Sequence, residues 1–199
     1  MLSNMETIEL GAGFGYTLST SDTLVAEDDV LRIDGRSLGA SDVLQFDGTA
    51  EQDGRFTLLG GAGDDILRGG FASNSLVGNG GADQLFGGYG WDRFVYRTVA
   101  DSTGPEYDTI VGFRSAGDDR IEFPTKPSAD DPWVTTGTLS TASFNSDLGA
   151  AIGADQLGIG NAVRFTADAG SLAGQTFLIA DANGVAGYQA NADYVIRLA

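Results

Sequence analysis

The chain of 199 residues contains neither cysteine nor histidine. Without cysteine, disulfide bonds, thiolate metal sites and cysteine nucleophiles are excluded. Without histidine, the Ser-His-Asp arrangement of many hydrolases, the His-based zinc sites of metalloproteases and most general-base schemes are excluded as well. The composition therefore argues against an enzyme that uses the common catalytic side chains.

Positive charge is also scarce, because 11 lysine and arginine residues stand against 28 aspartate and glutamate residues, for a net charge of −17. Nucleic acid and anionic membranes attract basic surfaces, so neither is expected as a partner. No apolar run approaches the roughly 20 residues of a transmembrane segment. Residues 1–4 lack the basic start and apolar core of a signal peptide. A carboxylate excess suits a protein whose charge is neutralised by bound cations, since the compact state otherwise repels itself.

Glycine, by contrast, is abundant, and it organises residues 60–95 into four copies of a nine-residue unit. Each copy approximates Gly-Gly-x-Gly-x-Asp-x-U-x, in which U is a large apolar residue. This nonapeptide is the one found in calcium-binding parallel β-helices. The sixth and eighth positions hold Asp65 and Leu67, Asn74 and Leu76, Asp83 and Leu85, and Asp92 and Phe94.

Each unit combines a turn that suits a metal with a very short strand. Glycine permits positive φ angles and close backbone approach, so the turn carbonyls can point at a common centre. Carboxylates and carbonyls are hard oxygen ligands, which suit Ca²⁺ better than zinc or copper. One unit cannot bury its apolar residue, whereas stacked units can. A flexible glycine-aspartate linker is the alternative interpretation, but a linker has no need of an apolar residue every nine positions.

A two-sided β-roll places successive turns on opposite edges, so stacked turns are 18 residues apart. This spacing predicts Asp65 beneath Asp83, and Asp83 beneath Asp101, on one edge. On the other edge it predicts Asn74 beneath Asp92. A Ca²⁺ ion would bind between stacked turns. Because asparagine lacks the negative charge, we expect the second edge to bind calcium more weakly, or to bind one ion fewer.

The segments around the repeats predict further short strands and one short helix. Residues 51–59 are interpreted as a degenerate unit, with Phe56 at the sixth position. The expected fold is all-β: a parallel β-roll, or two-sided β-solenoid, over residues 51–101, with an N-terminal strand stack over 1–50 and a C-terminal antiparallel β cap over 102–199. The expected strands lie at residues 7–10, 16–18, 30–33, 43–46, 107–113, 118–123, 162–165, 176–179 and 194–198, and the helix near 147–152.

Two aspartates that open strands after the repeats, Asp108 and Asp119, are further candidate calcium ligands. Asp118 is the alternative to Asp119, because only one of the two neighbours need point inward. A satisfied turn aspartate is the other interpretation at each position. The stretch Asp181-Ala182-Asn183-Gly184 resembles the start of an EF-hand loop but lacks its closing glutamate, so an Asx-type hairpin turn is favoured.

The nine-residue units resemble those of the RTX (repeats-in-toxin, haemolysin-type) family of secreted calcium-binding proteins. Residues 87–123 resemble more closely the C-terminal β-roll domain of serralysin-type metalloproteases. The resemblance rests on Asp92-Arg93-Phe94-Val95-Tyr96, Asp101-Ser102, Asp108-Thr109-Ile110 and Asp119-Arg120-Ile121. Residues 177–198 are similar to the region that holds an uncleaved C-terminal type I secretion signal. The histidines of the protease are absent, so the resemblance is to the calcium and export module.

The resemblance implies Ca²⁺ as the cofactor, bound by the carbonyls of the glycine turns and by the sixth-position side chains. Asp101, Asp108 and Asp119 extend this set. The implied ligands are Gly60, Gly61, Ala62, Gly63, Asp65, Gly78, Asn79, Gly80, Gly81 and Asp83 on one edge, and Gly69, Gly70, Asn74, Gly87, Gly88, Tyr89, Gly90 and Asp92 on the other.

The implied function is that of a non-enzymatic module that folds on Ca²⁺ outside a bacterial cell. It would serve as the C-terminal export and folding domain of a larger protein, with type I secretion machinery as a transient partner. The alternative is a calcium-rigidified adhesin or surface-layer segment with a cell-surface or glycan partner. A glycoside hydrolase built on paired carboxylates is a third hypothesis, which is disfavoured because the acidic residues lie mostly in the metal turns.

Overall fold

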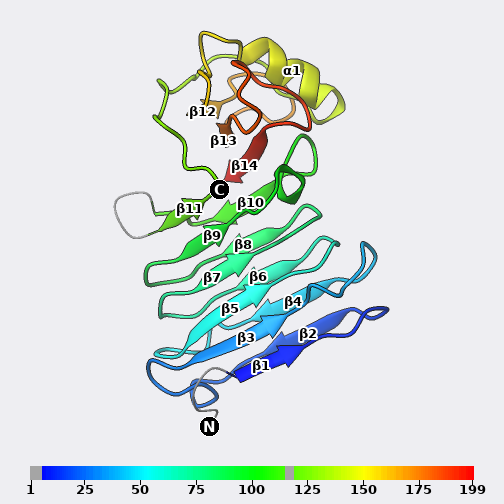
Figure 1. Cartoon of the computed structure of the whole chain (residues 1–199), viewed down its shortest axis with the longest axis vertical. Helices are drawn as coiled ribbons and strands as arrows, with labels where there is room; N and C mark the ends of the chain where they lie inside the picture. The colour runs from blue at the N-terminus through cyan, green and yellow to red at the C-terminus, as the bar shows by residue number, and fades with distance from the viewer. Residues whose placement is uncertain (1–5, 115–118) are drawn as a thin grey trace.

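The computed structural model describes residues 6–114 and 119–199, which fold into a stack of short strands topped by a smaller cap (Figure 1). Two 3-10 helices, Val99–Asp101 and Thr141–Ser143, and one α-helix interrupt the strands. In the stack the strands are β1 (Glu6–Glu9), β2 (Tyr16–Ser19), β3 (Val30–Asp34), β4 (Leu44–Asp47), β5 (Arg55–Leu59), β6 (Ile66–Arg68), β7 (Ser75–Val77), β8 (Gln84–Phe86), β9 (Arg93–Val95), β10 (Asp108–Val111) and β11 (Arg120–Glu122). In the cap the elements are α1 (Phe144–Ala151), β12 (Ala162–Thr166), β13 (Thr176–Ala180) and β14 (Tyr194–Leu198).

Successive strands of the stack alternate between two sheets, as a two-sided roll requires. The odd-numbered strands form a six-stranded sheet in the order β1-β3-β5-β7-β9-β11, and the even-numbered strands β2 to β10 belong to a second sheet. All neighbours within the roll pair in parallel, and the apolar eighth positions face one another, as Leu67 does Leu85 and Leu76 does Phe94. The structure therefore confirms the parallel β-roll.

The interior of the roll is a narrow apolar column. The eighth-position residues are all at most 1% exposed, including Leu76 and Phe94. Strands outside the repeats extend the column with residues such as Ile33, Phe46 and Ile110. Each short strand thus contributes little more than one large side chain, and burial depends on the coils above and below.

The N-terminal strands continue both sheets. Ile33 pairs with Leu58, and Phe46 pairs with Leu67, so the coils before the repeats keep the same register. The degenerate unit supplies β5, in which Phe56 is buried. The sheets continue across the predicted domain boundaries at residues 50 and 101, because β4 pairs with β6 across the first and β8 pairs with β10 across the second. The division at these two residues stays a prediction about units of sequence.

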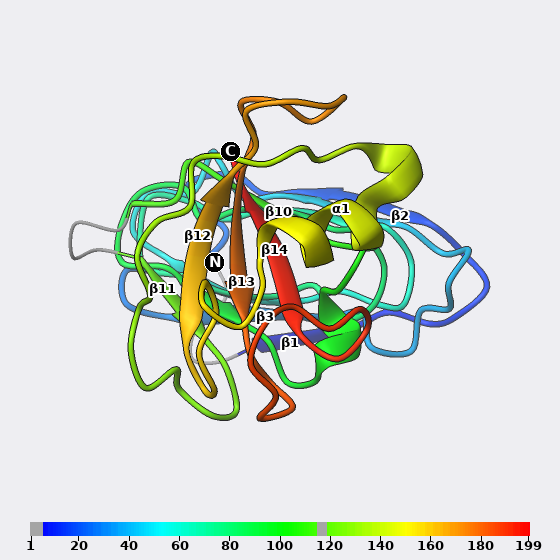
Figure 2. The same cartoon turned by 90° about the horizontal axis from the view of Figure 1, so that it is seen from above.

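The C-terminal cap is an antiparallel β12-β13-β14 sheet with its own core. Its last strand, β14, also pairs in parallel with β10, which joins cap and roll in one eight-stranded sheet. Helix α1 packs Leu148 against a cluster that includes Phe165 and Phe177. Figure 2 shows the cap strands and α1 lying across the end of the roll. Of the helices in the described ranges, none is long and apolar enough to span a membrane.

Candidate metal-binding edges of the roll

The repeat turns lie directly on one another at both edges of the roll. Gly81 has a φ of +104°, and a Cβ there would lie 2.6 Å from the carbonyl oxygen of Gly63, in the turn one coil below. Glycine is required for another reason at the first position of each unit. A Cβ at Gly78 would overlap the carboxylate of Asp83, and one at Gly87 would overlap that of Asp92. The repeated glycine at the first position of the unit therefore makes room for the acidic side chain of the same unit.

One edge, here called the Asp83 edge, carries Asp65, Asp83, Asp101 and Asp108. Three of these form a ladder in which Oδ1 accepts a backbone N–H from the coil below. Asp65 receives that of Leu44 (2.7 Å), Asp83 that of Asp65 (2.7 Å), and Asp108 that of Asp83 (2.9 Å). The predicted stacking of Asp65 and Asp83 is confirmed.

The prediction that Asp101 follows Asp83 in this stack is wrong, since Asp108 takes that place. The coil after β9 contains an additional 3-10 helix, so the ladder partner of Asp83 lies 25 residues away instead of 18. Asp101 ends that helix, and its Oδ2 accepts the backbone N–H groups of Arg97 (2.6 Å) and Thr98 (3.1 Å). Asp101 stays near enough to add negative charge at Asp83.

Two carboxylates of the Asp83 edge are buried without a partner for their second oxygen. Asp83 is 1% exposed and Asp108 is 0% exposed, and within the described ranges Oδ2 of each makes no hydrogen bond. Burial, reinforced by neighbouring carboxylates, raises the pKa of both side chains above the usual range. Burial and the neighbouring Asp108 carboxylate raise the pKa of the Tyr96 hydroxyl, which lies near that carboxylate without meeting the geometry of a hydrogen bond. Unpartnered buried oxygens of this kind fit a hard cation such as Ca²⁺.

The predicted carbonyl ligands lie on the same edge but partly serve the protein itself. The carbonyl of Gly61 accepts the N–H of Gly80 (3.2 Å), and the carbonyl of Gly60 accepts the side-chain amide of Asn79 (2.7 Å). Over residues 6–114 and 119–199, no three acidic side chains converge as a group that could hold a metal. The acidic residues stack along the edge, so the calcium ligand set stays a prediction.

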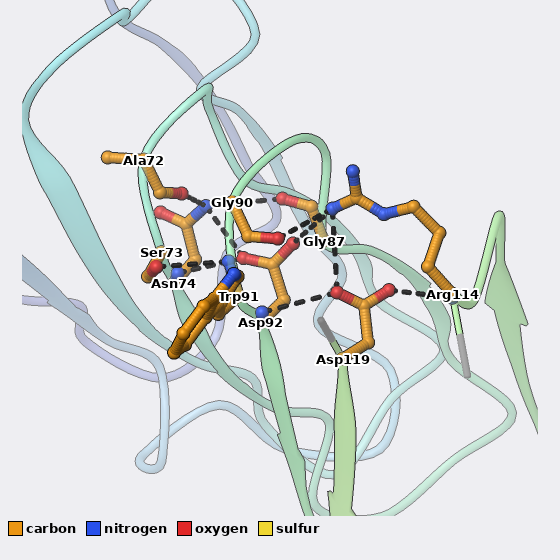
Figure 3. A network of polar contacts seen from close by, with 9 residues as sticks. All are labelled: Ala72, Ser73, Asn74, Gly87, Gly90, Trp91, Asp92, Arg114 and Asp119. Atoms are coloured by element: carbon orange, nitrogen blue, oxygen red, sulfur yellow. Dashed lines mark hydrogen bonds and ion pairs between the residues drawn. The ribbon is translucent and has the colours of Figure 1, made fainter. Parts of the chain in front are cut away.

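The opposite edge, here called the Asp92 edge, carries Asn74, Asp92, Asp119 and Arg114 (Figure 3). The same ladder recurs there: Oδ1 of Asn74 accepts the N–H of Phe56 (3.0 Å), Oδ1 of Asp92 that of Asn74 (2.8 Å), and Oδ1 of Asp119 that of Asp92 (3.3 Å). Asp119 therefore fills the ladder position, while Asp118 lies outside the described residues.

Nitrogen donors distinguish the Asp92 edge. The amide nitrogen of Asn74 donates to the carbonyls of Ala72 (2.6 Å) and Gly87 (3.2 Å). A guanidinium nitrogen of Arg114 donates to the carbonyl of Gly90 (2.7 Å). It lies 3.5 Å from Oδ1 of Asp119 and 3.8 Å from Oδ2 of Asp92. Burial raises the pKa of Asp92 to about 6, although the Asn74 hydrogen bonds and the Arg114 charge oppose this shift.

Sequence reasoning missed Arg114, because no spacing rule marks an arginine in the link between two strands. It also omitted two acidic residues of the N-terminal coils. Asp42 accepts the N–H groups of Gly13 and Gly39, and Glu51 those of Val25 and Gly54. These carboxylates are satisfied by the backbone, so they form turns without need of a metal.

The structure places the side chain of Tyr89 and the loop after β13, while calcium binding by the Tyr89 carbonyl stays a prediction. Tyr89, implied as a carbonyl ligand, has a side chain that is 60% exposed and stacks on Phe71 with the ring centres 4.7 Å apart. The loop after β13 is an Asx-type turn, in which Oδ1 of Asp181 accepts the N–H groups of Asn183 and Gly184.

Comparison with known families agrees with this architecture. Residues 29–130, just over half of the chain, match the family model described as Peptidase M10 serralysin C terminal. The match is to the non-catalytic C-terminal domain of a peptidase family. A search of curated proteins finds no match. On the strength of the family match and the β-roll, the chain belongs to the serralysin C-terminal family of RTX-type β-roll domains.

Proposed function

We propose that the chain is a calcium-binding RTX module that folds when Ca²⁺ binds outside the cell. The observation that carries the proposal is the pair of unpartnered, buried carboxylate oxygens on Asp83 and Asp108. An unpaired buried charge is strongly unfavourable. A Ca²⁺ ion bound by these oxygens and by turn carbonyls would neutralise that charge, and this is the whole of the chemistry that it would supply.

Calcium-coupled folding follows from how little each coil buries. One large apolar side chain per nine residues returns less free energy than the ordering of a glycine-rich turn requires. When a metal site exists only in the folded chain, the free energy of metal binding becomes free energy of folding. Extracellular calcium modules bind at about 10⁻⁴–10⁻³ M, far above the calcium level of a cytosol. The roll is therefore unfolded inside the cell and folded outside.

This switch suits a C-terminal export and folding domain of a larger protein that leaves a bacterium by type I secretion. An export channel threads an unfolded chain, and external calcium then drives folding on the far side. The family match to the C-terminal domain of serralysins supports this role, as does the similarity of residues 177–198 to a secretion signal. The proposed location is extracellular or on the cell surface, and the secretion machinery is a transient partner.

Far-UV circular dichroism during a calcium titration tests the proposal. The chelated chain should lack much of its β signal and regain it with a midpoint near 10⁻⁴–10⁻³ M Ca²⁺. Magnesium is the control, since its strict octahedral geometry and firmly held waters do not suit an all-protein turn site. A full β signal in chelator, or equal recovery with magnesium, would show that folding does not depend on calcium.

A further inference from the structure

The two edges of the roll share one ladder and differ in what faces the second atom of each ladder side chain. On both edges, Oδ1 accepts a backbone N–H from the coil below. The second atom then points into the turn, where a calcium ion would bind. At Asp83 and Asp108 this atom is an oxygen with no hydrogen-bond donor in the described chain. Oδ2 of Asp92 also makes no hydrogen bond within the described ranges, but a guanidinium nitrogen of Arg114 lies 3.8 Å from it.

At Asn74 the second atom is a nitrogen, and its direction is fixed by the surrounding groups. The N–H of Phe56 can only donate, so it must face the carbonyl oxygen of the Asn74 amide. The amide nitrogen consequently points at two acceptors, the carbonyls of Ala72 and Gly87, and also lies 3.1 Å from Oδ1 of Asp92. Backbone carbonyls and a carboxylate are the ligands that calcium would require, and here they already bind a donor.

One coil further along, the guanidinium of Arg114 lies between the same kinds of acceptor. It donates to the Gly90 carbonyl and lies within 4 Å of a carboxylate oxygen of Asp119 and one of Asp92. Asp92 is 0% exposed. A guanidinium is charged at every physiological pH, so it is a permanent cation at this position. A Ca²⁺ ion at the same place would meet electrostatic repulsion instead of a free site.

The Asp83 edge has no such cation. Within the described part of the chain, no arginine or lysine forms an ion pair with Asp65, Asp83 or Asp108. Among the described residues, the side-chain donor in these turns is the Asn79 amide, which binds the Gly60 carbonyl. Oδ2 of Asp65 accepts the backbone N–H of Gly61 (2.6 Å), whereas Oδ2 of Asp83 and of Asp108 stays unpartnered in the described chain. The two edges therefore share the same backbone ladder, but only the Asp92 edge places a positively charged side chain beside the ladder carboxylates of the described chain.

We propose that Arg114 and Asn74 occupy the calcium positions of the Asp92 edge with the protein's own donors, so that calcium binding is confined to the Asp83 edge. The proposal rests on the proposed function for the identity of the ion. It makes Arg114 and Asn74 the residues that decide how many ions the roll takes and on which side. The Asp92 edge then has no place for calcium, because Arg114 and Asn74 take up these positions as soon as the chain folds.

Calcium bound per chain, measured by equilibrium dialysis, tests this assignment on a set of single variants. We expect Asp83→Asn to lose bound calcium and Asp92→Asn to retain the wild-type amount. Arg114→Gln and Asn74→Asp should each gain an ion, because the first removes the cation and the second replaces an amide donor with a carboxylate oxygen. Asn74→Asp keeps Arg114, so it stays informative if Arg114→Gln fails to fold.

The matched control is Arg93→Gln. Arg93 directly follows Asp92 in the sequence and pairs with Glu122 of the neighbouring strand β11. Its side chain, however, is 56% exposed. This variant makes the same change of charge and should leave the bound calcium unchanged. The proposal is overturned if Asp92→Asn loses as much calcium as Asp83→Asn, or if Arg114→Gln and Asn74→Asp both keep the wild-type amount.

Terbium luminescence locates the additional ion. Trp91 lies beside Asn74 and Asp92 (Figure 3), so it can transfer energy to terbium bound on that edge. Arg114→Gln should gain a tryptophan-sensitised signal that the additional change Trp91→Phe abolishes. A gained signal that survives the loss of Trp91 would place the ion elsewhere and contradict the proposal.

A separate outcome would identify failure of the proposed function. If wild type and all variants bind no calcium, the roll folds without metal, and urea unfolding in chelator becomes the deciding measurement. Arg114→Gln should then lower the urea midpoint roughly twice as much as Arg93→Gln, because it leaves buried carboxylates unpaired, whereas Arg93 faces solvent. Equal shifts of the two midpoints would overturn the role of Arg114 as the cation that faces the buried carboxylates, since its own side chain is 36% exposed.

Discussion

The roll and the cap are both β-structures, but they are stabilised in different ways. Coils of the roll enclose a thin apolar column whose edges hold buried aspartates. The cap encloses a broad apolar cluster in which Tyr107 and Phe144 both pack against Phe177. Side-chain packing of that kind supplies stability without a cofactor. Under the proposed function, calcium would be needed where the chain buries little hydrocarbon and much charge.

A buried carboxylate in each part makes the difference concrete. Asp193 of the cap is 0% exposed, yet its two oxygens accept the N–H groups of Ala182 (3.2 Å) and Gln189 (2.7 Å). Asp83 of the roll is as deeply buried, and Oδ2 has no donor in the described chain. The backbone therefore satisfies both oxygens of Asp193 in the cap, whereas at Asp83 in the roll it leaves one oxygen without a donor among the described residues.

The largest expected effect is that of calcium removal. Hydrogen exchange followed by mass spectrometry should show residues 60–95 losing protection in chelator, because their coils depend on the ion. Residues 162–180, which lie within the cap sheet, should stay largely protected. Equal loss of protection in both parts, or no loss in either, would remove the contrast between them.

Alanine at a glycine should have opposite effects in the two parts. Gly78→Ala places a Cβ over the Asp83 carboxylate, so calcium-dependent folding of the roll should be lost. Gly149→Ala, in helix α1, meets nothing within 4 Å and should raise the free energy of unfolding by about 0.5–1 kcal/mol. Urea unfolding with and without calcium measures both, and a Gly78→Ala chain that folds normally would contradict the tight turn.

Amide replacement of the two buried acids should separate metal binding from hydrogen bonding. Asp83→Asn removes a ligand charge and should raise the calcium midpoint of folding about tenfold or more. Asp193→Asn should lower stability at saturating calcium by about 1–3 kcal/mol, since one backbone N–H loses its acceptor. Its calcium midpoint should shift far less. Equal shifts of the midpoint would indicate that both acids act only through the stability of the whole chain.

The smallest expected effect concerns pH. Burial raises the pKa of Asp83, and it raises that of Asp193 to about 6, from an ordinary 3.8. When the pKa of a group is higher in the folded than in the unfolded chain, its protonated form stabilises the fold. This contribution to the free energy of unfolding is complete below the unfolded-state pKa of 3.8 and is lost as the pH rises through the folded-state pKa. In chelator, the cap should therefore be more stable at pH 5 than at pH 7, and a larger fraction of the roll should be folded at pH 5 than at pH 7.

Calcium should reverse this dependence in the roll alone, because protons then compete with the ion for the same oxygens. The two tryptophans separate the parts. Trp133→Phe leaves Trp91 to report on the roll, and Trp91→Phe leaves Trp133 to report on the cap. Fluorescence-detected unfolding at both pH values measures the effect. A reversal seen in the cap, or its absence in the roll, would contradict metal binding by the Asp83 edge.

The periodic part of this fold was accessible from the sequence. An apolar residue every nine positions determines both sheets, and the strand positions outside the repeats follow from short apolar runs between turns. The expected helix near 147–152 is observed as α1, a few residues earlier. These features depend on local pattern, which a single sequence displays.

The details of the two edges were less accessible. Counting by nines selected Asp101 as the successor of Asp83, but the 3-10 helix at Val99–Asp101 lengthens that coil and brings Asp108 into the ladder. The role of Arg114 depends on a side chain that turns back toward Gly90, 24 residues earlier. Neither an inserted turn nor the direction of a side chain produces a repeating pattern in the sequence, so neither could be predicted from the nine-residue period.

Strand β14 has a consequence for the order in which the molecule assembles. Coils of the roll contact their nearest neighbours, so they can form one after another with little loss of chain entropy. Roll and cap are joined by the pairing of β10 with β14, in which Asp108 lies opposite Ile196. Most of the C-terminal half of the sequence separates these two residues. Contacts so distant in the chain form slowly. A chain that emerges with its N-terminal end first would build the roll coil by coil and close the eight-stranded sheet last.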